Sequence, residues 1–195
     1  MPEPHPGSIA AIIILAYLLG SLSFGIIYSR LRGTDVRTQD LPGGSGIYRS
    51  YGLGPAITVV ILDVLKGALA AYAAQRLTPG WEWTAVFAVV TGHNYPIYFR
   101  FNGGGGIAPF IGALAVTAPL TITATLAVAL TFMPLYKRFL QVRIGLNVIP
   151  ATAAVALPIG LLIAARTGGW RDLLAGAVAM AVRAAHLLKQ EPPKT

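Results

Sequence analysis

The chain has 195 residues, of which 55% are hydrophobic and only 11% charged, and its mean hydropathy is +0.65. Fifteen Lys and Arg and seven Asp and Glu cannot cover the core of an ordinary water-soluble domain, so that class is excluded. Cysteine is absent, which excludes disulfides, thiolate nucleophiles and cysteine-ligated metals. The net charge of +8 comes from cations between apolar runs, so we expect membrane lipid as the surroundings and no nucleic-acid partner.

Apolar runs of about 20 residues, long enough to cross a bilayer, recur along the chain. They lie near residues 8–28, 54–75, 83–99, 146–165 and 170–188, with a longer stretch at 106–136. Pro119 interrupts that stretch because it lacks an amide proton, so we expect two short helices that meet at Ala118 and Pro119. The sequence predicts an all-α bundle of about seven short transmembrane helices. Residues 1–195 form one integral membrane domain in this prediction, with flexible tails at 1–7 and 189–195.

The Lys and Arg residues predict the orientation of the bundle. Assigning alternate loops to the cytoplasm places 11 cations inside and 3 outside, which agrees with the positive-inside rule. With six spans the cluster from Lys137 to Arg143 would fall outside. We therefore expect seven spans, an outside N-terminus, a cytoplasmic C-terminus and a multi-pass location in the cytoplasmic, or inner, membrane.

Polar residues within or beside the apolar runs indicate where function lies, because each costs free energy unless it is paired or functional. Ser21, in the small-residue segment 20–25, fits close helix packing at least as well as a chemical role. The loop that follows contains Gly44, Ser45 and Arg49, whose amides, hydroxyl and guanidinium are together typical of an anion site. A plain flexible loop is an equal alternative for that segment.

Two further groups follow in the chain. Asp63 and Lys66 are three residues apart on one helix face, which predicts a neutralising pair and leaves substrate contact by Lys66 as the alternative. Four glycines at 103–106 directly precede a predicted helix, where amides at the positive end of the helix dipole can hold phosphate. His93 is either a buried hydrogen-bonding histidine or a site residue. Together these groups predict a site for a phosphate-bearing, lipid-like substrate at the cytoplasmic face.

In this order the segments resemble the bacterial acyl-phosphate:glycerol-3-phosphate acyltransferase family, which are seven-helix membrane enzymes. The matching stretches cover nearly the whole chain and are Gly20 to Gly25, Arg32-Gly33-Thr34-Asp35-Val36-Arg37, Asp63-Val64-Leu65-Lys66-Gly67, and Gly92-His93-Asn94-Tyr95-Pro96 leading to Phe101 and the glycines. The resemblance implies transfer of a fatty acyl group from acyl phosphate to the 1-hydroxyl of glycerol 3-phosphate. The product would be lysophosphatidic acid, an intermediate of phospholipid synthesis, and neither a cofactor nor a metal would be needed.

The resemblance also implies residue roles. The family's glycine loop holds the acyl-phosphate head, and Ser45 and Arg49 match the residues that bind glycerol 3-phosphate. The chain has Asn102 and Gly105 where the family has lysines, and Arg183 aligns near a family asparagine implicated in catalysis. The candidate catalytic residues are Arg49, His93 and Arg183. The candidate substrate-binding residues are Gly44, Ser45, Lys66, Asn94, Asn102, Gly103, Gly104, Gly105 and Gly106, and the residues with structural or pairing roles are Asp63 and Ser21.

Two other functions stay open at this point. The chain would be a divergent paralogue that binds acyl phosphate or phospholipid without catalysis if the missing contacts, each worth roughly 1.5–3 kcal/mol, are not replaced. A small transporter of lipids or phosphate compounds would also suit polar residues at membrane depth, although the sequence contains no inverted repeat. The acyl-chain preference, the exact acceptor and the oligomeric state stay open as well.

Overall fold

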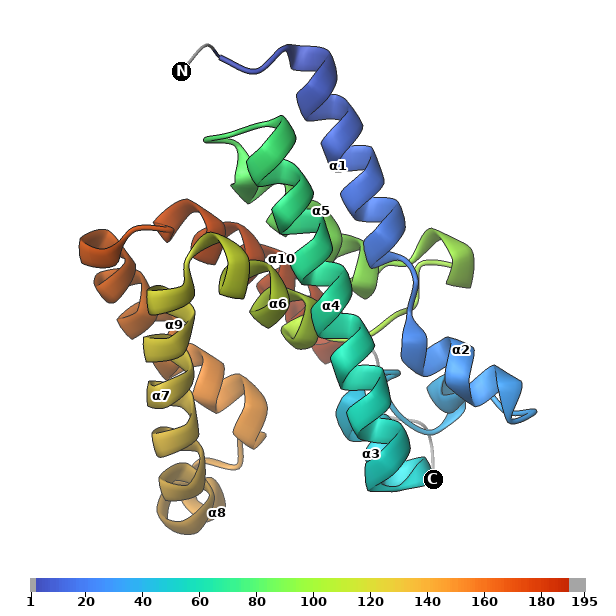
Figure 1. The fold of residues 1–195 in the computed structure, drawn as a ribbon. Coiled ribbons are helices and arrows are strands. Elements are labelled where there is room, and N and C mark those ends of the chain that lie inside the picture. The colour runs from blue at the N-terminus through green and yellow to red at the C-terminus, as the bar shows by residue number, and fades with distance from the viewer. Residues whose placement is uncertain (1–2, 190–195) are drawn as a thin grey trace.

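The computed structural model describes residues 3–189, in which the secondary structure is helical and no strand occurs (Figure 1). The helices in chain order are α1 Pro6–Gly20, α2 Phe24–Leu31, η1 Val36–Thr38, α3 Gly44–Tyr51, α4 Leu53–Leu77, α5 Glu82–Asn94, η2 Ile97–Phe99, α6 Ile107–Thr117, α7 Pro119–Leu135, η3 Tyr136–Leu140, α8 Gln141–Ile144, α9 Val148–Thr167 and α10 Trp170–Lys189. Of the expected tails, residues 1–2 and 190–195 lie outside the described residues, and α1 already begins inside the N-terminal one.

The apolar segments agree with the all-α prediction. Four helical segments are long and apolar enough to cross a membrane, namely Pro6–Leu31, Leu53–Leu77, Pro119–Ile144 and Val148–Thr167, and Ile107–Thr117 is a shorter apolar helix. α6 ends at Thr117 and α7 begins at Pro119, so the long stretch divides where the proline predicts. α5 ends at Asn94, short of the predicted run 83–99, because Pro96 follows at a position where a helix cannot continue.

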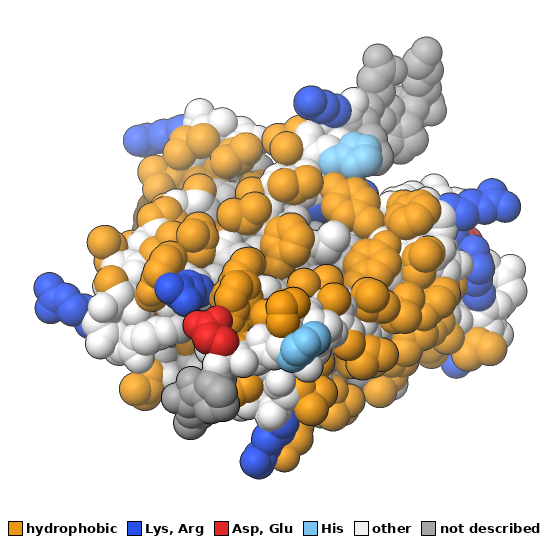
Figure 2. Space-filling view, turned by 90° about the horizontal axis from the view of Figure 1, so that it is seen from above, with side chains coloured by type: hydrophobic (Ala, Val, Ile, Leu, Met, Phe, Trp, Pro, Cys, Tyr) orange, Lys and Arg blue, Asp and Glu red, His pale blue; other side chains and the backbone are white. Residues whose placement is uncertain are grey.

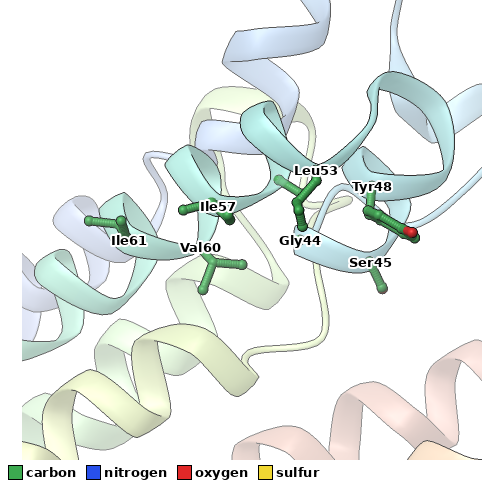
Figure 3. Close-up of a pocket in the computed structure, with 8 residues that line it drawn as sticks. Gly44, Ser45, Tyr48, Leu53, Ile57, Val60 and Ile61 are labelled. Carbon is green, nitrogen blue, oxygen red and sulfur yellow. The ribbon is translucent and has the colours of Figure 1, made fainter.

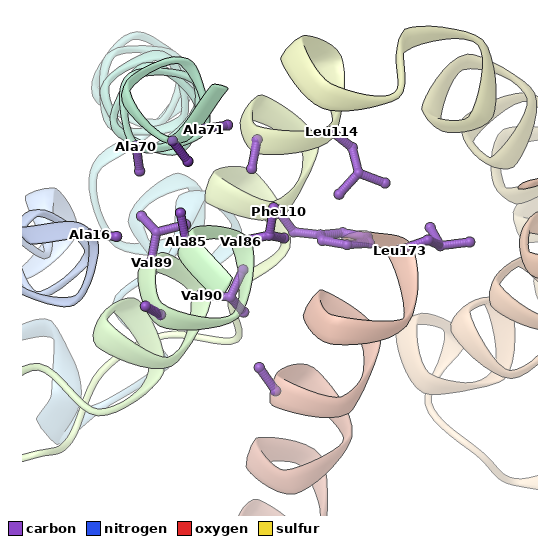
Figure 4. Close-up of a cluster of buried hydrophobic side chains, with 14 of the residues drawn as sticks. Ala16, Ala70, Ala71, Ala85, Val86, Val89, Val90, Phe110, Leu114 and Leu173 are labelled. Atoms are coloured by element: carbon purple, nitrogen blue, oxygen red, sulfur yellow. The ribbon is translucent and has the colours of Figure 1, made fainter. Parts of the chain in front are cut away.

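The short helix α5 lies at the centre of the bundle. It packs against α1, α4, α6 and α10. Figure 4 shows its side chains Val86, Val89 and Val90 in one cluster with residues of the surrounding helices, including Phe110 of α6 and Leu173 of α10. α7 and α9 pack mainly against each other, with α8 at their far end (Figure 1).

Small residues bring the helices close together. An added Cβ on Gly67 of α4 would collide with the Pro109 carbonyl of α6, and one on Gly112 of α6 would collide with the Val64 carbonyl of α4. Membrane helices associate through such contacts because lipid gives little hydrophobic drive for helix pairing. The two glycines therefore fix the distance between α4 and α6.

The outer surface of the bundle is largely apolar. Figure 2 shows a face on which hydrophobic side chains predominate and most Lys and Arg side chains lie toward the margins. Leu31 is 81% exposed and Val142 94% exposed. Apolar exposure on this scale suits contact with lipid and not with water.

Candidate functional site

A buried ion cluster lies where α4, α5 and the break between α1 and α2 meet. The Lys66 Nζ atom lies 2.7 Å from Asp63 Oδ1 and 2.9 Å from His93 Nδ1. It also donates to the carbonyls of Gly20 and Leu22, at 2.9 and 2.7 Å. These carbonyls lie at the helix break, where amide donors from the next turn are missing. Lys66 therefore satisfies the helix break as well as neutralising Asp63.

Lys66 presents no free donor to a substrate in this structure. The residue is 2% exposed, and four protein atoms surround the three protons of its ammonium group. The contacts that Lys66 makes are those of the neutralising pair and of the helix break, because a buried charge needs partners within the protein, and its contact with a substrate stays a prediction. Asp63 lies in the pair that its spacing predicts. Ser21 is also fully buried, and its hydroxyl donates to the Tyr17 carbonyl at 2.8 Å.

His93 connects this cluster to the glycine loop, which we define as residues 103–106. Its Nδ1 atom faces Lys66, and the opposite edge of its ring, with Nε2, lies against Gly104. A Cβ on Gly104 would collide with Nε2, so only glycine allows the loop to approach the ring this closely. His93 is 2% exposed. The histidine is therefore buried and hydrogen-bonded, and its Nε2 edge is turned toward the glycine loop.

The backbone of the glycine loop is tied to the end of α5. The Gly103 amide donates to the Asn94 carbonyl, and the Gly104 amide donates to the His93 carbonyl, both at 3.1 Å. The Asn94 side chain is fully buried and donates to the Ala179 carbonyl of α10 at 3.1 Å. Asn94 thus joins α5 to α10, while its Oδ1 atom lies beside Gly106 and has no hydrogen-bond partner within the described residues, so its contact with a substrate stays a prediction.

Two loop amides stay available for a ligand. Within residues 3–189, no acceptor takes the amides of Gly105 and Gly106, which precede the first turn of α6. Gly106 has φ +84°, a conformation that glycine adopts without strain. Of the four glycines predicted to hold phosphate, Gly103 and Gly104 use their amides within the protein, so the phosphate contact that stays predicted falls to the other two amides. The remaining pair lies at the positive end of the α6 dipole.

Arg183 of α10 reaches the glycine loop from the other side. Its Nε donates to the Gly104 carbonyl at 3.2 Å, and its Nη2 donates to the Gly103 carbonyl at 2.7 Å and to Asn102 Oδ1 at 3.0 Å. The residue is 1% exposed. Asn102, predicted to bind substrate, thus holds Arg183 with its side-chain oxygen. Arg183, predicted as catalytic, directs these donors at the protein backbone and at Asn102.

Arg37 also contacts the segment before the glycine loop, although the sequence did not single it out as a candidate site residue. Its Nη1 donates to the carbonyls of Phe99 and Asn102, at 2.8 and 3.2 Å, so it joins the first loop to the segment before the glycines. Asp35 accepts from Arg37 at 2.6 Å, and this guanidinium holds the pKa of the Asp35 carboxyl at about 2. Both residues lie in the run 32–37, which is one of the stretches that resemble the family. That resemblance was therefore a signal for Arg37 that the glycine motifs alone did not give.

The first glycine-rich segment forms α3, a helix that packs on α4. Arg49 is paired with Asp40 at 2.5 Å, and its side chain is 58% exposed. The Arg49 guanidinium holds the pKa of Asp40 below its usual range. Within the described residues Arg49 has no hydrogen bond or ion pair to the glycine loop, so the two predicted anion sites are not joined by a direct contact.

An open apolar groove runs between α3 and α4 beside Ser45 (Figure 3). Its volume is about 360 Å³, and the residues that line it are Gly44, Ser45, Tyr48, Leu53, Ala56, Ile57, Val60 and Ile61. Tyr48 of α3 and the apolar side chains of α4 form most of the lining, beside Gly44 and Ser45. The groove is thus almost wholly apolar, as contact with an acyl chain requires.

The apolar helical bundle defines the class of protein, an integral membrane protein, and comparison with known proteins agrees. The family model described as glycerol-3-phosphate acyltransferase matches residues 10–190. The chain therefore belongs to the glycerol-3-phosphate acyltransferase family. Among solved structures, the crystal structure of PlsY, an integral membrane glycerol 3-phosphate acyltransferase, in its glycerol 3-phosphate form, is 26% identical with a TM-score of 0.77. The similarity covers 93% of this chain and 90% of that one.

Two relatives come from Deinococcus radiodurans. The protein named glycerol-3-phosphate acyltransferase 2 is 53% identical over 188 residues, which are 94% of this chain and 96% of the relative. The protein named glycerol-3-phosphate acyltransferase 1 is 35% identical over 125 residues, which are 62% of this chain and 63% of the relative. One organism thus carries two members, and this chain is similar over almost its full length to the one numbered 2.

Proposed function

We propose that the chain transfers a fatty acyl group from acyl phosphate to the 1-hydroxyl of glycerol 3-phosphate. In this reaction the hydroxyl oxygen forms a bond to the acyl carbon, the bond from that carbon to the phosphate oxygen breaks, and the hydroxyl proton leaves with the phosphate or to water. The products are lysophosphatidic acid and inorganic phosphate. Because acyl phosphate is already activated, positioning and charge stabilisation supply the catalysis, and no covalent enzyme intermediate is needed.

One observation carries this proposal beyond family membership. Two amides at the start of α6, those of Gly105 and Gly106, have no acceptor among residues 3–189, while the loop around them is fixed. In the proposed site they hold the acyl-phosphate head, and His93 Nε2 lies against Gly104 of the same loop. Ser45 and Arg49, beside the apolar groove, bind the glycerol 3-phosphate anion. The Arg49 Nη1 group has no partner within residues 3–189, so it is free to donate to phosphate.

The topology belongs to the same proposal. One membrane domain crosses the bilayer seven times, with an outside N-terminus and a cytoplasmic C-terminus, in the cytoplasmic membrane. The four long apolar segments and the shorter α6 support this arrangement. The distribution of Lys and Arg supports the direction, because it places the phosphate-binding loops on the side where phosphorylated metabolites are made.

The experiment that tests the activity measures lysophosphatidic acid formed by purified protein from acyl phosphate and glycerol 3-phosphate. We expect turnover, and Arg49→Ala should lower kcat/KM for glycerol 3-phosphate about tenfold or more, because it removes a charge-assisted contact. Arg76→Ala, which removes an exposed cation on α4 outside the site, is the matched control and should leave turnover unchanged. Folded protein that forms no product would contradict the proposed activity. Unchanged kinetics of Arg49→Ala would contradict the role of Arg49.

A second candidate function is a paralogue that binds acyl phosphate or phospholipid without turnover. The favouring observation is that the Arg183 donors to the loop are held by backbone carbonyls and Asn102, while the sequence has no counterpart of the family's catalytic asparagine. The occurrence of two members in Deinococcus radiodurans is compatible with such a division of roles. Saturable binding of acyl phosphate without product would select this candidate.

A further inference from the structure

The contact between Arg183 and the glycine loop decides where a loop amide points. The Gly104 carbonyl accepts from Arg183 Nε. Because a trans peptide unit is planar and its carbonyl and amide point in opposite directions, the Gly105 amide in the same unit is turned away from Arg183. That amide is one of the two without an acceptor within the described residues. Arg183 thus orients a group that the proposed function uses.

Within residues 3–189, no carboxylate neutralises the charge of Arg183. Three other cations around the site have carboxylate partners: Arg37 pairs with Asp35, Arg49 with Asp40 and Lys66 with Asp63. Within residues 3–189, no ion pair forms at Arg183, although the residue is 1% exposed. Its guanidinium lies over the Tyr95 ring, 5.3 Å from the centroid. A buried cation without a counter-charge is costly in free energy and therefore favours an anion nearby.

We propose that Arg183 is the positioning residue of the glycine loop. It holds the Gly104 carbonyl so that the Gly105 amide faces the phosphate of the substrate, and its unpaired charge draws that phosphate to the loop. The ligand class is a phosphate monoanion or dianion, which is the acyl-phosphate head if the proposed function holds. This inference rests on the proposed function only for the identity of the phosphate, and not for its binding.

Two substitutions separate the charge from the orientation. Arg183→Gln removes the charge and keeps one amide donor for a carbonyl, whereas Arg183→Lys keeps the charge and loses the fork that bonds several acceptors at once. We expect Arg183→Gln to raise KM for acyl phosphate at least about tenfold while KM for glycerol 3-phosphate changes less than about twofold. We expect Arg183→Lys to recover most of that KM but to retain a lowered kcat, because the loop is no longer held.

The matched control is Arg171→Gln, which removes an exposed arginine at the opposite end of the same helix, where it lies over Trp170. It should keep the parent values of both KM and kcat. A merely structural role for Arg183 would change both KM values together and would not be rescued by Lys, so that pattern overturns the proposal. Unchanged kinetics of folded Arg183→Gln overturns it as well.

A binding measurement keeps this test independent of turnover. Inorganic phosphate should raise the thermal unfolding temperature of the parent protein and of Arg171→Gln, and this shift should be lost in Arg183→Gln. If Arg183→Gln does not fold, Arg183→Lys carries the decision: it should keep most of the phosphate shift and of the parent KM for acyl phosphate but show a lowered kcat, and a parent kcat would overturn the role. A parent protein without turnover but with an Arg183-dependent phosphate shift would contradict the proposed function and support the positioning role, and a shift unaffected by Arg183 would overturn the role.

Discussion

Lys66 both neutralises a buried charge and donates hydrogen bonds to backbone carbonyls. Its ammonium neutralises Asp63 and also bonds the carbonyls of Gly20 and Leu22 where the first apolar segment breaks. In a bilayer interior, unpaired carbonyls and unpaired charges are both expensive. One buried lysine removes both costs, which gives a physical reason for a cation in the middle of an apolar helix.

The Lys66 cluster leads to a prediction at the residue scale. Lys66→Met should lower the free energy of unfolding by roughly 3–5 kcal/mol, because it leaves the Asp63 carboxylate buried without its main partner. Adding Asp63→Asn should recover part of that loss, since the buried charge is then gone. The recovery should be incomplete, because the carbonyls at the helix break still lack their donor. Unfolding of purified protein in detergent measures these differences.

Arg76→Met on the same helix is the control for this cycle, because Arg76 is exposed and contacts only the Tyr72 ring among the interactions within the described residues. It should change the free energy of unfolding by less than about 0.5 kcal/mol. Equal stability of Lys66→Met and Arg76→Met would contradict the role of Lys66 in closing the helix break.

At the scale of elements, the glycines decide how closely the helices approach. Gly112 lies against the Val64 carbonyl and Gly67 against the Pro109 carbonyl, so α4 and α6 meet backbone to backbone. This contact places the start of α6, with its two available amides, beside α4 and the ion cluster. The position of the candidate site therefore depends on helix crossings as much as on the site residues.

Gly112→Ala should destabilise the fold by roughly 1–3 kcal/mol, because the new methyl group collides with a backbone carbonyl that cannot move without shifting α4. Gly54→Ala is a matched control in the first turn of α4, where nothing lies within 4 Å of the added Cβ. It should leave stability unchanged or raise it slightly, since alanine favours helix. Thermal unfolding in detergent compares the two, and equal effects would contradict the close crossing.

The whole molecule has one well-packed part and one looser part. α5 is surrounded by four helices, whereas α7 and α9 rely mainly on each other (Figure 1). The candidate site belongs to the well-packed part, at the ends of α5 and α10 and the start of α6. Packing from several sides gives the loop a fixed shape, which electrostatic catalysis requires.

The proposed topology is testable because the chain contains no cysteine, so each introduced thiol is unique. With seven spans we expect Ser8→Cys and Arg166→Cys to react with an impermeant thiol reagent in intact cells. Ser50→Cys and Arg143→Cys should react only after permeabilisation. A six-span chain would exchange the behaviour of Arg143→Cys and Arg166→Cys while leaving the other two unchanged, so this pair decides between the topologies.

Several features of the fold were predictable from local sequence. Apolar length and the absence of charged stretches predicted helices, Pro119 predicted the division between α6 and α7, and the glycine run predicted a loop before a helix. The spacing of Asp63 and Lys66 put them on one helix face. Each of these depends on neighbours within a few residues, where helix geometry fixes the relation between positions.

Only the tertiary structure decided which side chains bond to groups far away in the chain. Lys66 bonds carbonyls more than 40 residues away, Arg37 reaches Phe99, and Arg183 reaches Gly104 across 79 residues. The sequence by itself determined that the chain is an apolar helical bundle, because composition and periodicity express solvent preference, and its phosphate-binding loop stays a prediction. It did not determine which polar groups face a ligand and which face the backbone, because that depends on how the helices cross.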